Sequence, residues 1–490
     1  MTQSRKTTLR LKDAPEAPAS EKPTARQRTG ARARQAARQA LARQAAAGSG
    51  SASAPVASAP TGPTRPATQA TVRQRPATGR PVPARRDRPA TAVQQHRPAH
   101  VQDTFKAFAP CPQGLEHSLA QELQGLGLAA VTAGRAGCHF EARWQDLLRA
   151  NLHSRLATRI LMQVAQAPVH TEDDILSLAR ATPWEHWFGP EHSLRVDTSA
   201  IHSPMRSLQY CNLRAKDGIC DRLREREGAR PDIDTVRPDA RVHLFLDAHQ
   251  ATLYIDLSGE SLFKRGWRLD KGAAPLRENL AAGLLILSGW PGDAPLLDPF
   301  CGSGTVLIEA AWMALGVPPG IWRPFAFERL RNHDHRLWRD LKDDARSHIM
   351  TRLEQPMVGA DHDPAAIEAA RANLQRAHLA PDSIRFEVCD VREVLPPADR
   401  GWIVTNPPYG ERLGVADADA LWAGWSRWLK QHYAGWQLNI ISDDMGLPGR
   451  LRLKARRRHP LYNGALECRL FQFDLNPDAY RAERPQNHTA

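Results

Sequence analysis

Hydrophobic and polar positions change their rhythm along the chain at about residue 276. Beyond this point, short and almost wholly apolar runs recur between amphipathic segments. These runs are PLLDPF (295–300), PMVGAD (356–361), IRFEVCD (384–390), GWIVTN (401–406) and WQLNIISDD (436–444). Strands that are apolar on both sides are typical of a parallel sheet covered by helices on both faces. The pattern therefore predicts an α/β domain with a Rossmann-like, doubly wound sheet over residues 276–475.

The C-terminal end of this region predicts an antiparallel hairpin. RLRLKARRR (450–458) and LECRLFQFDL (466–475) read as two strands joined by a two-residue turn around Asn463-Gly464. A terminal antiparallel hairpin in an otherwise parallel sheet indicates a class I methyltransferase rather than a nicotinamide dehydrogenase. In the first strand Arg450, Arg452, Lys454 and Arg456 alternate with apolar residues. That basic face suits a phosphate track, and it suits a solvated edge strand equally well.

Residues 105–258 alternate strand and helix patterns more loosely, which predicts a small α+β region. TFKAFAPC (104–111) is expected to be a strand and GLEHSLAQELQGLGL (114–128) an amphipathic helix. VHLFLDAHQATLYIDLSG (242–259) is expected to form two strands around a turn near His249. A helix is expected over 210–226, with Leu213, Ile219 and Leu223 on its buried side.

The first 104 residues have the composition of a disordered tail. They contain no Phe, Trp, Tyr, Ile or Cys, so they cannot bury enough apolar surface to offset the entropy of ordering. Residues 1–101 hold 19 Lys and Arg against 4 Asp and Glu, which leaves the rest of the chain slightly acidic although the total formal charge is +13. The tail is therefore either an arm that contacts RNA phosphates or a solubilising extension.

The remaining composition favours a cytoplasmic protein. The seven cysteines form no C-x-x-C pair, which fits free thiols in a reducing compartment. No apolar run approaches the roughly 20 residues that a membrane span needs, and the N-terminus has no hydrophobic signal region. The Arg-rich, acid-poor N-terminus also resembles a mitochondrial transit peptide, which remains the alternative.

LLDPFCGSGT (296–305) joins a buried strand to an apolar helix and indicates a cofactor loop. Gly302 and Gly304 allow the backbone to approach a ligand closely. No G-K-[ST] follows, which disfavours a P-loop. Asp361 ends the next strand, where a carboxylate can accept both ribose hydroxyls. Asp390 ends the third strand and is either an acceptor for an adenine amine or a turn residue.

Asn406-Pro407-Pro408-Tyr409 follows the fourth strand, at the carboxyl edge where open α/β sheets bind ligands. The Asn406 amide oxygen can accept a hydrogen bond from an exocyclic amine, and the Pro407 carbonyl can accept a second. Proline stiffens the turn, and Tyr409 offers a face on which a base can stack. Alone this string is also a common rigid turn. Because it follows a strand of the same sheet as the glycine loop, the two motifs together predict methyl transfer to a base amine.

Several other residues that could be functional are better explained by structural roles. Asp363 and Pro364 are expected to cap the following helix. His333 and His335 are interleaved with charged residues on an expected solvated helix, so no metal site is predicted. Cys301 is expected to be a small packing residue. Trp422, Trp425 and Trp428 are spaced for the core rather than for an RNA platform.

At this point the sequence resembles bacterial THUMP-domain RNA methyltransferases of class I. The likeness is greatest to the 23S ribosomal RNA guanine-N2 enzymes, as the N-terminal half of the bifunctional form. The matching runs are GLEHSLAQEL (114–123), SRLATRIL (154–161), SLQYCNLRAKDGICD (207–221), IDLSGESLFKRGWR (255–268), APLRENLAAGLLILSGW (274–290), LLDPFCGSGTVLIEAA (296–311) and TNPPYGERLG (405–414). The resemblance implies the following division of the chain: a disordered basic tail (1–104), a ferredoxin-like part (105–148), an RNA-binding THUMP domain (149–258), a linker (259–275), the catalytic domain (276–475) and a disordered C-terminus (476–490).

The resemblance also implies S-adenosylmethionine as cofactor and 23S ribosomal RNA, or a large-subunit precursor, as partner. It places the methionine end of the cofactor against five residues of the loop and its first helical turn: Asp298, Cys301, Gly302, Gly304 and Thr305. Asp361 would hold the ribose, Asp390 the adenine, and Asn406 to Tyr409 the target base. Three basic residues would contact RNA: Lys216, Lys264 and Arg265. No second methyltransferase domain follows, so the 7-methylguanine activity of bifunctional relatives is expected to be absent.

Three alternatives stay open at the level of the sequence. The acceptor could be a guanine N2 of transfer RNA or an adenine N6, since N-P-P-Y serves all of these amines. A third possibility is a non-catalytic RNA-binding ribosome assembly factor on a relic methyltransferase fold.

Overall fold

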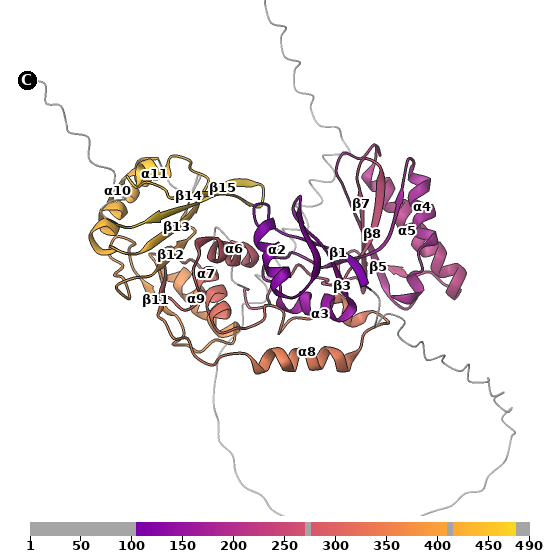
Figure 1. Ribbon diagram of the computed structural model, residues 1–490, viewed down its shortest axis with the longest axis horizontal. Coiled ribbons are helices and arrows are strands. Elements are labelled where there is room, and N and C mark those ends of the chain that lie inside the picture. Colours follow the sequence, from indigo (N-terminus) through magenta and orange to yellow (C-terminus); the bar gives the residue numbers. More distant parts are fainter. Residues whose placement is uncertain (1–103, 270–275, 409–414, 477–490) are drawn as a thin grey trace, which may run out of the picture. The chain divides into compact units, whose positions relative to one another are not determined.

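The computed structural model describes residues 104–269, 276–408 and 415–476 (Figure 1). Nearly all of the expected basic tail, part of the expected linker, Tyr409 and the C-terminal residues lie outside these ranges. The described chain forms two sheets of eight and seven strands, each with its own helices. The α/β class predicted from the apolar runs is confirmed.

The first sheet has the strand order β2-β3-β1-β4-β8-β7-β5-β6. Its strands are β1 (Thr104–Pro110), β2 (Ala129–Gly134), β3 (Gly137–Arg143), β4 (Leu161–Pro168), β5 (Ser193–Ala200), β6 (Asp232–Ile233), β7 (Ala240–Leu246) and β8 (Gln250–Asp256). Its helices are α2 (Glu116–Gly125), α3 (Trp144–His153), α4 (Glu172–Ala181), the 3-10 turn η1 (Trp184–His186) and α5 (Leu208–Glu227). β4 pairs with β1 on one side and β8 on the other, so one continuous sheet crosses the expected boundary at residue 148.

Helix α5 corrects one sequence expectation. Ile219 and Leu223 are buried as expected, but the side of α5 that packs on α4 is built largely from small residues, and Leu213 is 44% exposed. At Gly218 a Cβ would lie only 2.6 Å from the Leu176 carbonyl oxygen of α4. The two helices therefore pack closely at Gly218. Leu213 lies five residues earlier, about 140° around the helix from Gly218, and is on the exposed side of α5.

The second sheet has the order β11-β10-β9-β12-β13-β15-β14. Its strands are β9 (Leu296–Asp298), β10 (Met357–Asp361), β11 (Arg385–Val388), β12 (Trp402–Thr405), β13 (Gln437–Ser442), β14 (Arg457–Asn463) and β15 (Leu466–Asp474). Its helices are α6 (Glu278–Ser288), α7 (Thr305–Ala314), the 3-10 turn η2 (Ala326–Arg329), α8 (His335–Ser347), α9 (Pro364–Arg376), α10 (Val415–His432) and α11 (Leu447–Arg450). β15 is antiparallel to both β13 and β14, while β9 to β13 are parallel, as the terminal hairpin predicted.

Alternate residues of the parallel strands enter two different cores, which explains their wholly apolar sequences. Leu296 and Val404 join the core that contains α6, α7 and α9. Leu297 and Ile403 join the core that contains Trp422 and other residues of α10. Both faces of the sheet are therefore covered, and the tryptophans of α10 pack over it as expected.

The chain before β14 does not form the expected basic strand. It is the short helix α11 followed by an irregular segment in which Leu451 and Leu453 are fully buried. Arg450 pairs with Asp444 at 2.9 Å instead of lining an open track. The hairpin itself is confirmed, with its two-residue turn at 464–465, one residue later than expected.

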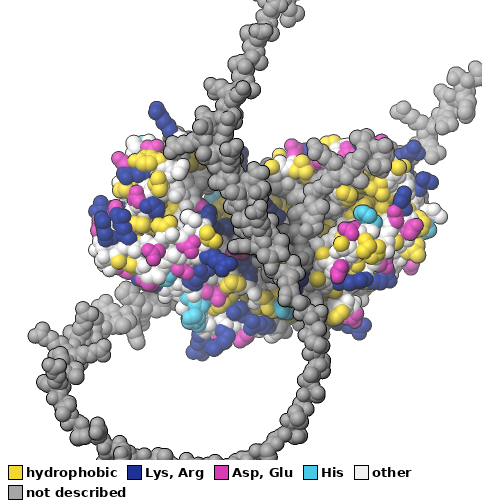
Figure 2. All heavy atoms as spheres, turned by 180° about the vertical axis from the view of Figure 1, so that it is seen from behind, with side chains coloured by type: hydrophobic (Ala, Val, Ile, Leu, Met, Phe, Trp, Pro, Cys, Tyr) yellow, Lys and Arg dark blue, Asp and Glu magenta, His cyan; other side chains and the backbone are white. Residues whose placement is uncertain are grey.

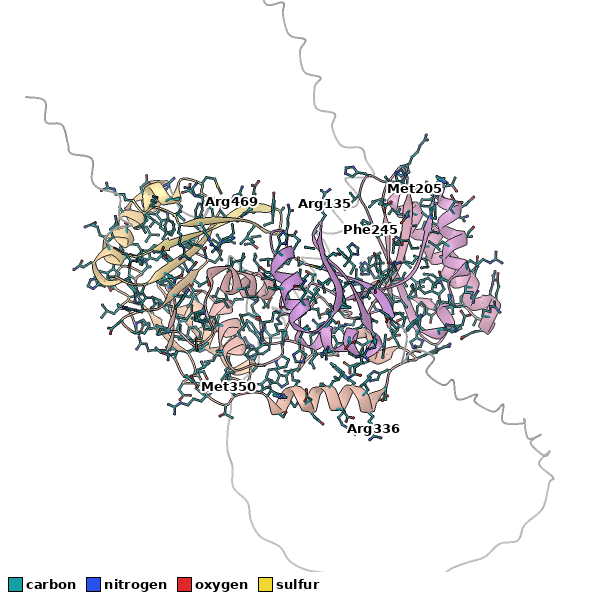
Figure 3. All side chains as sticks on the ribbon, viewed as in Figure 1. Arg135, Met205, Phe245, Arg336, Met350 and Arg469 are labelled. Carbon is teal, nitrogen blue, oxygen red and sulfur yellow. The ribbon has the colours of Figure 1, made fainter. Side chains whose placement is uncertain are left out.

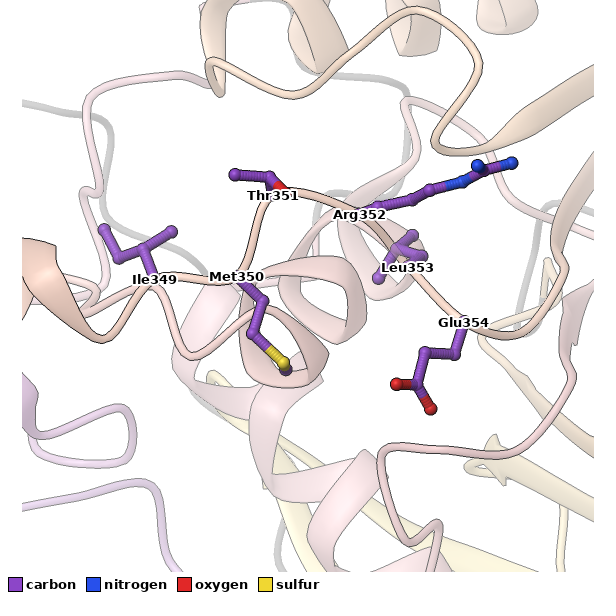
Figure 4. Close-up of a pocket in the computed structure, with 6 residues that line it drawn as sticks. All are labelled: Ile349, Met350, Thr351, Arg352, Leu353 and Glu354. Atoms are coloured by element: carbon purple, nitrogen blue, oxygen red, sulfur yellow. The ribbon is translucent and has the colours of Figure 1, made fainter.

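The stretch between α7 and β10 contributes α8, whose charged side faces solvent. Arg336, labelled in Figure 3, has a side chain that is 84% exposed. After α8 the chain lines a hollow formed by residues 349–354 (Figure 4). This hollow precedes the first residue of β10, so it lies towards the amino ends of the parallel strands. Ligands of such sheets bind at the opposite, carboxyl ends.

Candidate functional site

The carboxyl ends of β9 and β12 meet through a buried hydrogen bond. Asp298 ends β9 and is 2% exposed, and Thr405 ends β12 and is fully buried. The Thr405 hydroxyl donates to Asp298 Oδ1 at 2.6 Å, and the Phe300 N–H donates to the same oxygen at 3.2 Å. This contact joins the first residues of the glycine loop to the residue before Asn406.

The glycine loop is fastened to the end of β10. The Cys301 N–H donates to the Ala360 carbonyl at 2.9 Å, and the Gly302 N–H donates to Asp361 Oδ2 at 3.0 Å. The Asp363 N–H occupies one position on Asp361 Oδ1 at 3.0 Å. A carboxylate has about four acceptor positions, so Asp361 keeps capacity for further hydroxyl donors. Asp363 caps α9, with Pro364 in its first turn, as predicted.

The two loop glycines are required for different reasons. Both have a positive φ, +52° at Gly302 and +79° at Gly304. A Cβ at Gly302 would meet nothing within 4 Å, whereas a Cβ at Gly304 would lie 3.0 Å from Phe386 and 3.2 Å from Ala370. Gly302 therefore borders open space, and Gly304 permits α7 to pack against β11 and α9.

We expect Gly304→Ala to destabilise the fold more than Gly302→Ala. A left-handed backbone costs either alanine about 1 to 2 kcal/mol, and overpacking adds about 1 to 3 kcal/mol at position 304 only. Urea denaturation of the two variants measures the difference. Equal losses of unfolding free energy would show that Phe386 and Ala370 do not constrain the loop.

Burial controls the ionisation of Asp298. Desolvation raises its pKa to about 7, against the lowering effect of the hydrogen bonds from Thr405 and Phe300. An unfolded aspartate titrates near pH 4, so between about pH 4 and 7 the folded chain keeps a proton that the unfolded chain has lost. This group therefore makes the fold less stable as the pH rises through that window.

Asp298→Asn should remove this component of the pH dependence. We expect the variant to gain stability relative to the parent chain between pH 5 and pH 8, by roughly 1 to 4 kcal/mol. Denaturation of both proteins at the two pH values gives the difference, in which the other titrating groups cancel. A constant difference would mean that Asp298 is ionised throughout.

Asn406, Pro407 and Pro408 follow β12 directly. Pro407 is buried, and Asn406 and Pro408 are half-buried. Asn406 Oδ1 is buried and accepts no hydrogen bond from any residue in the described ranges. A buried amide oxygen without a donor is costly, so Asn406 is the residue at this edge whose hydrogen bonding the described residues leave incomplete. Tyr409, the expected stacking residue, lies outside the described part of the chain.

Asp390 lies at the same edge, next to Asp361. The neighbouring Cys389 N–H donates to the Asp361 carbonyl at 3.0 Å. Arg392 holds the Asp390 carboxylate with its Nε at 2.8 Å and its Nη2 at 2.6 Å, and this contact lowers the pKa of Asp390 to about 2. The Arg392 N–H also donates to Asp390 Oδ1, which is the turn arrangement considered as the alternative.

Sequence reasoning missed two side chains that fix the end of the loop. Arg268 Nη1 donates to Thr305 Oγ1 at 3.1 Å, and the fully buried Asn373 of α9 donates to the Ser303 carbonyl at 3.0 Å. In the sequence, Arg268 is marked only by belonging to the IDLSGESLFKRGWR run, and Asn373 lies in none of the matching runs. Spacing gave no reason to place either residue beside the loop.

The three residues expected to contact RNA differ in their exposure. Lys216 pairs with Asp217, and Lys264 lies on the surface, 3.2 Å from Glu260. Arg265 is 2% exposed and pairs with the buried Glu309 at 3.1 Å, so its guanidinium cannot reach a phosphate. The expectation for Arg265 is therefore wrong. Figure 2 shows basic and acidic side chains mixed over the visible face.

Within the described ranges, no three His, Cys, Asp or Glu side chains gather closely enough to hold a metal ion. No helix in the same ranges is long and apolar enough to cross a membrane.

The described fold joins an α+β sheet to a Rossmann-like sheet with a terminal antiparallel hairpin, and family models match each part. Residues 106–161 match the RlmL ferredoxin-like domain, 169–256 the THUMP domain, and 265–472 the RMKL-like methyltransferase domain. The resemblance inferred from the sequence is thereby confirmed.

Two similar proteins share one name. The chain is 40% identical over 395 residues to the ribosomal RNA large subunit methyltransferase K/L of Syntrophotalea carbinolica, and 40% identical over 385 residues to that of Methylococcus capsulatus. These alignments cover 78% and 77% of this chain but 55% and 52% of the relatives. The chain is thus homologous to these methyltransferases and spans about half of their length.

Solved structures show the same architecture. SMU.472, described as a methyltransferase and crystallised with SAH, matches 78% of this chain and all of its own at 28% identity and a TM-score of 0.71. A predicted N6-adenine-specific DNA methylase from Listeria monocytogenes matches 76% of this chain and 96% of its own, at 29% identity and a TM-score of 0.69.

Proposed function

We propose that this chain transfers a methyl group from S-adenosylmethionine to the exocyclic N2 amine of a guanine in 23S ribosomal RNA. The observation that carries the proposal is the buried, unpartnered Asn406 Oδ1 beside the loop that follows β9. Two further findings support it: the names of the relatives, and a THUMP domain ahead of the methyltransferase fold.

The residues of the loop suit this cofactor. Gly302 leaves open space beside its backbone, and Asp361 keeps acceptor capacity for two ribose hydroxyls. Asp298, Cys301 and Thr305 would border the methionine end. Gly304 would act by packing α7 rather than by touching the ligand, since its Cβ position faces Phe386 and Ala370. Asp390 would accept from the adenine amine, with Arg392 keeping its carboxylate ionised.

Bound S-adenosylmethionine supplies an electrophilic methyl group on a sulfonium. Asn406 would accept one amine proton and the Pro407 carbonyl the other, which directs the nitrogen lone pair towards the methyl carbon. The nitrogen held in this way would take the methyl group from the sulfonium sulfur, which would become a neutral thioether, and the positive charge would then lie on nitrogen. The Asn406 amide is not basic, so the nitrogen then loses a proton to water. Catalysis would thus rest on orientation within a stiff turn.

The proposal is tested by incubating the protein with S-adenosylmethionine and purified 23S ribosomal RNA, 16S ribosomal RNA or transfer RNA, followed by nucleoside mass spectrometry. New 2-methylguanosine in 23S RNA alone supports the assignment. The same product in transfer RNA, or 6-methyladenosine in any RNA, would replace it with one of the alternative amine acceptors. Cofactor binding without any methylated product would favour a binding factor.

A further inference from the structure

The segment 257–269 leads from β8 towards α6, and its side chains alternate between the core and the surface. Leu262, Arg265 and Trp267 are each 2% exposed. Lys264 lies between two of them, and its side chain is 56% exposed. The Leu262 N–H donates to the chain just before β4, and Arg265 pairs with α7. The segment is therefore fixed to the elements of both sheets while Lys264 remains at the surface.

Phe263 and Arg277 form a stacked pair on this surface. The Arg277 guanidinium lies over the Phe263 ring, 5.1 Å from its centroid. Phe263 is half-buried and Arg277 is exposed, so the guanidinium covers the ring and stays accessible itself. The adjacent carboxylate, Glu278, pairs with Arg268, and no carboxylate in the described ranges pairs with Arg277. The surface therefore combines an aromatic ring with a cation whose charge is uncompensated.

The stability of α6 does not explain an arginine at position 277. Arg277 is the N-cap of this helix, and its carbonyl accepts from the Leu280 and Ala281 N–H groups at 3.0 and 2.9 Å. Ser, Thr, Asp and Asn are preferred there because their side chains accept hydrogen bonds from the first turn, and Arg277 makes no such contact. A cation at this end also opposes the helix dipole. The residue therefore indicates a role outside the helix.

The same segment joins the two parts of the chain that the proposed reaction uses. Residues 169–256 match the THUMP domain and end directly before it. Arg268, near its other end, donates to the Thr305 hydroxyl at 3.1 Å. Thr305 begins α7, which follows the glycine loop at the carboxyl edge of the parallel sheet. An RNA that contacts the THUMP domain and reaches Asn406 would therefore extend along this segment.

We propose that Phe263, Lys264 and Arg277 bind single-stranded RNA beside the nucleotide that is methylated. A base would stack on the Arg277 guanidinium, which Phe263 supports from below, and Lys264 would meet an adjoining phosphate. Stacking accepts any base, so this surface would contribute affinity and position rather than sequence choice. The inference rests on the proposed function for its RNA substrate, to which it assigns a second contact away from the reacting amine.

Two RNAs separate stacking from phosphate contacts. A fluorescein-labelled oligouridine of about 12 nucleotides carries bases and phosphates, whereas an abasic oligoribonucleotide of the same length carries the phosphates alone. Anisotropy titrations of the full chain with each RNA give two dissociation constants, and their ratio measures the contribution of the bases. The basic N-terminal residues add the same electrostatic attraction to both RNAs, so their contribution cancels in the ratio.

We expect Arg277→Lys to reduce the preference for oligouridine about 5- to 50-fold, because lysine keeps the charge and loses the planar guanidinium. Phe263→Leu should reduce it in the same direction, since the guanidinium loses its support. Lys264→Ala should weaken both RNAs equally and lower the slope of log affinity against log salt by about 0.7. Arg336→Lys is the matched control on α8, where the arginine side chain is 84% exposed, and it should change neither the ratio nor the slope.

Failure of this surface and failure of the proposed function give different results. Equal affinity of the unmodified chain for the two RNAs, or a preference for oligouridine that survives Arg277→Lys, would overturn the surface and leave the stack on Phe263 a structural role. A chain that makes no methylated guanine in 23S RNA would refute the proposed function, whereas a preference lost in Arg277→Lys would still locate RNA at this surface. Comparing two RNAs within each variant removes any effect of a substitution on folding.

Discussion

Asn406→Ala should lower turnover on RNA about 10²- to 10³-fold while the dissociation constant for S-adenosylhomocysteine stays within about twofold. The variant removes the one buried acceptor at the end of β12 that has no partner among the described residues. The amine would then lose the hydrogen bond that orients its lone pair. The residues proposed to border the cofactor lie at the ends of β9 and β10 and in the loop after β9, and they keep their own contacts. Single-turnover kinetics and calorimetry measure the two quantities separately.

Asn439 supplies a matched control for this prediction. It is 1% exposed on the adjacent strand β13, and its amide is fully used: Nδ2 donates to the Ile403 carbonyl at 3.3 Å and Oδ1 accepts from Gln472 at 3.0 Å. Asn439→Ala should therefore lower stability more than the turnover of the folded enzyme. Asn406→Asp keeps an acceptor oxygen and should retain more activity than Asn406→Ala. An Asn406→Ala variant with more than a tenth of the parent turnover would show that the amine is held elsewhere.

The parallel sheet and the position of its candidate site could both be predicted from the sequence. Apolar runs identify the strands, and the carboxyl ends of parallel strands lie at one edge. That rule places Asp298, Asp361 and Asn406 together without knowledge of any contact. The structure adds what fastens them, namely the Thr405 hydroxyl and the Gly302 N–H.

The failures of sequence reasoning concern side chains whose surroundings come from distant segments. Leu213 was expected on the buried side of α5 because it is apolar, but it lies on a different side of the helix from Gly218, which contacts α4, and it is 44% exposed. The alternation at 450–456 predicted a strand. Instead, Leu451 and Leu453 anchor an irregular segment to the core. Hydrophobicity alone does not distinguish these arrangements, since each depends on the shape of its neighbour.

Arg265 is the most instructive of these errors. A basic residue in an Lys-Arg pair is usually a solvated charge, and it was expected to contact RNA. Its guanidinium instead donates to Glu309, to the Leu262 carbonyl and to the Arg155 carbonyl. Arg155 in turn donates to the carbonyls of Trp312 and Val317 at 3.1 and 2.5 Å. The network ties the segments before β4 and after β8 to helix α7.

Arg265→Met should destabilise the protein by about 3 to 5 kcal/mol, because it leaves the fully buried Glu309 without its principal partner. The double variant Arg265→Met with Glu309→Leu should recover most of that loss, since a buried apolar pair needs no charge compensation. Lys264→Ala, next to Arg265 but exposed, should change stability by less than about 0.5 kcal/mol. Urea denaturation followed by tryptophan fluorescence measures all three. A small loss in Arg265→Met, or a double variant no more stable than the single one, would mean that Glu309 is neutral or hydrated and that Arg265 does not hold the junction together.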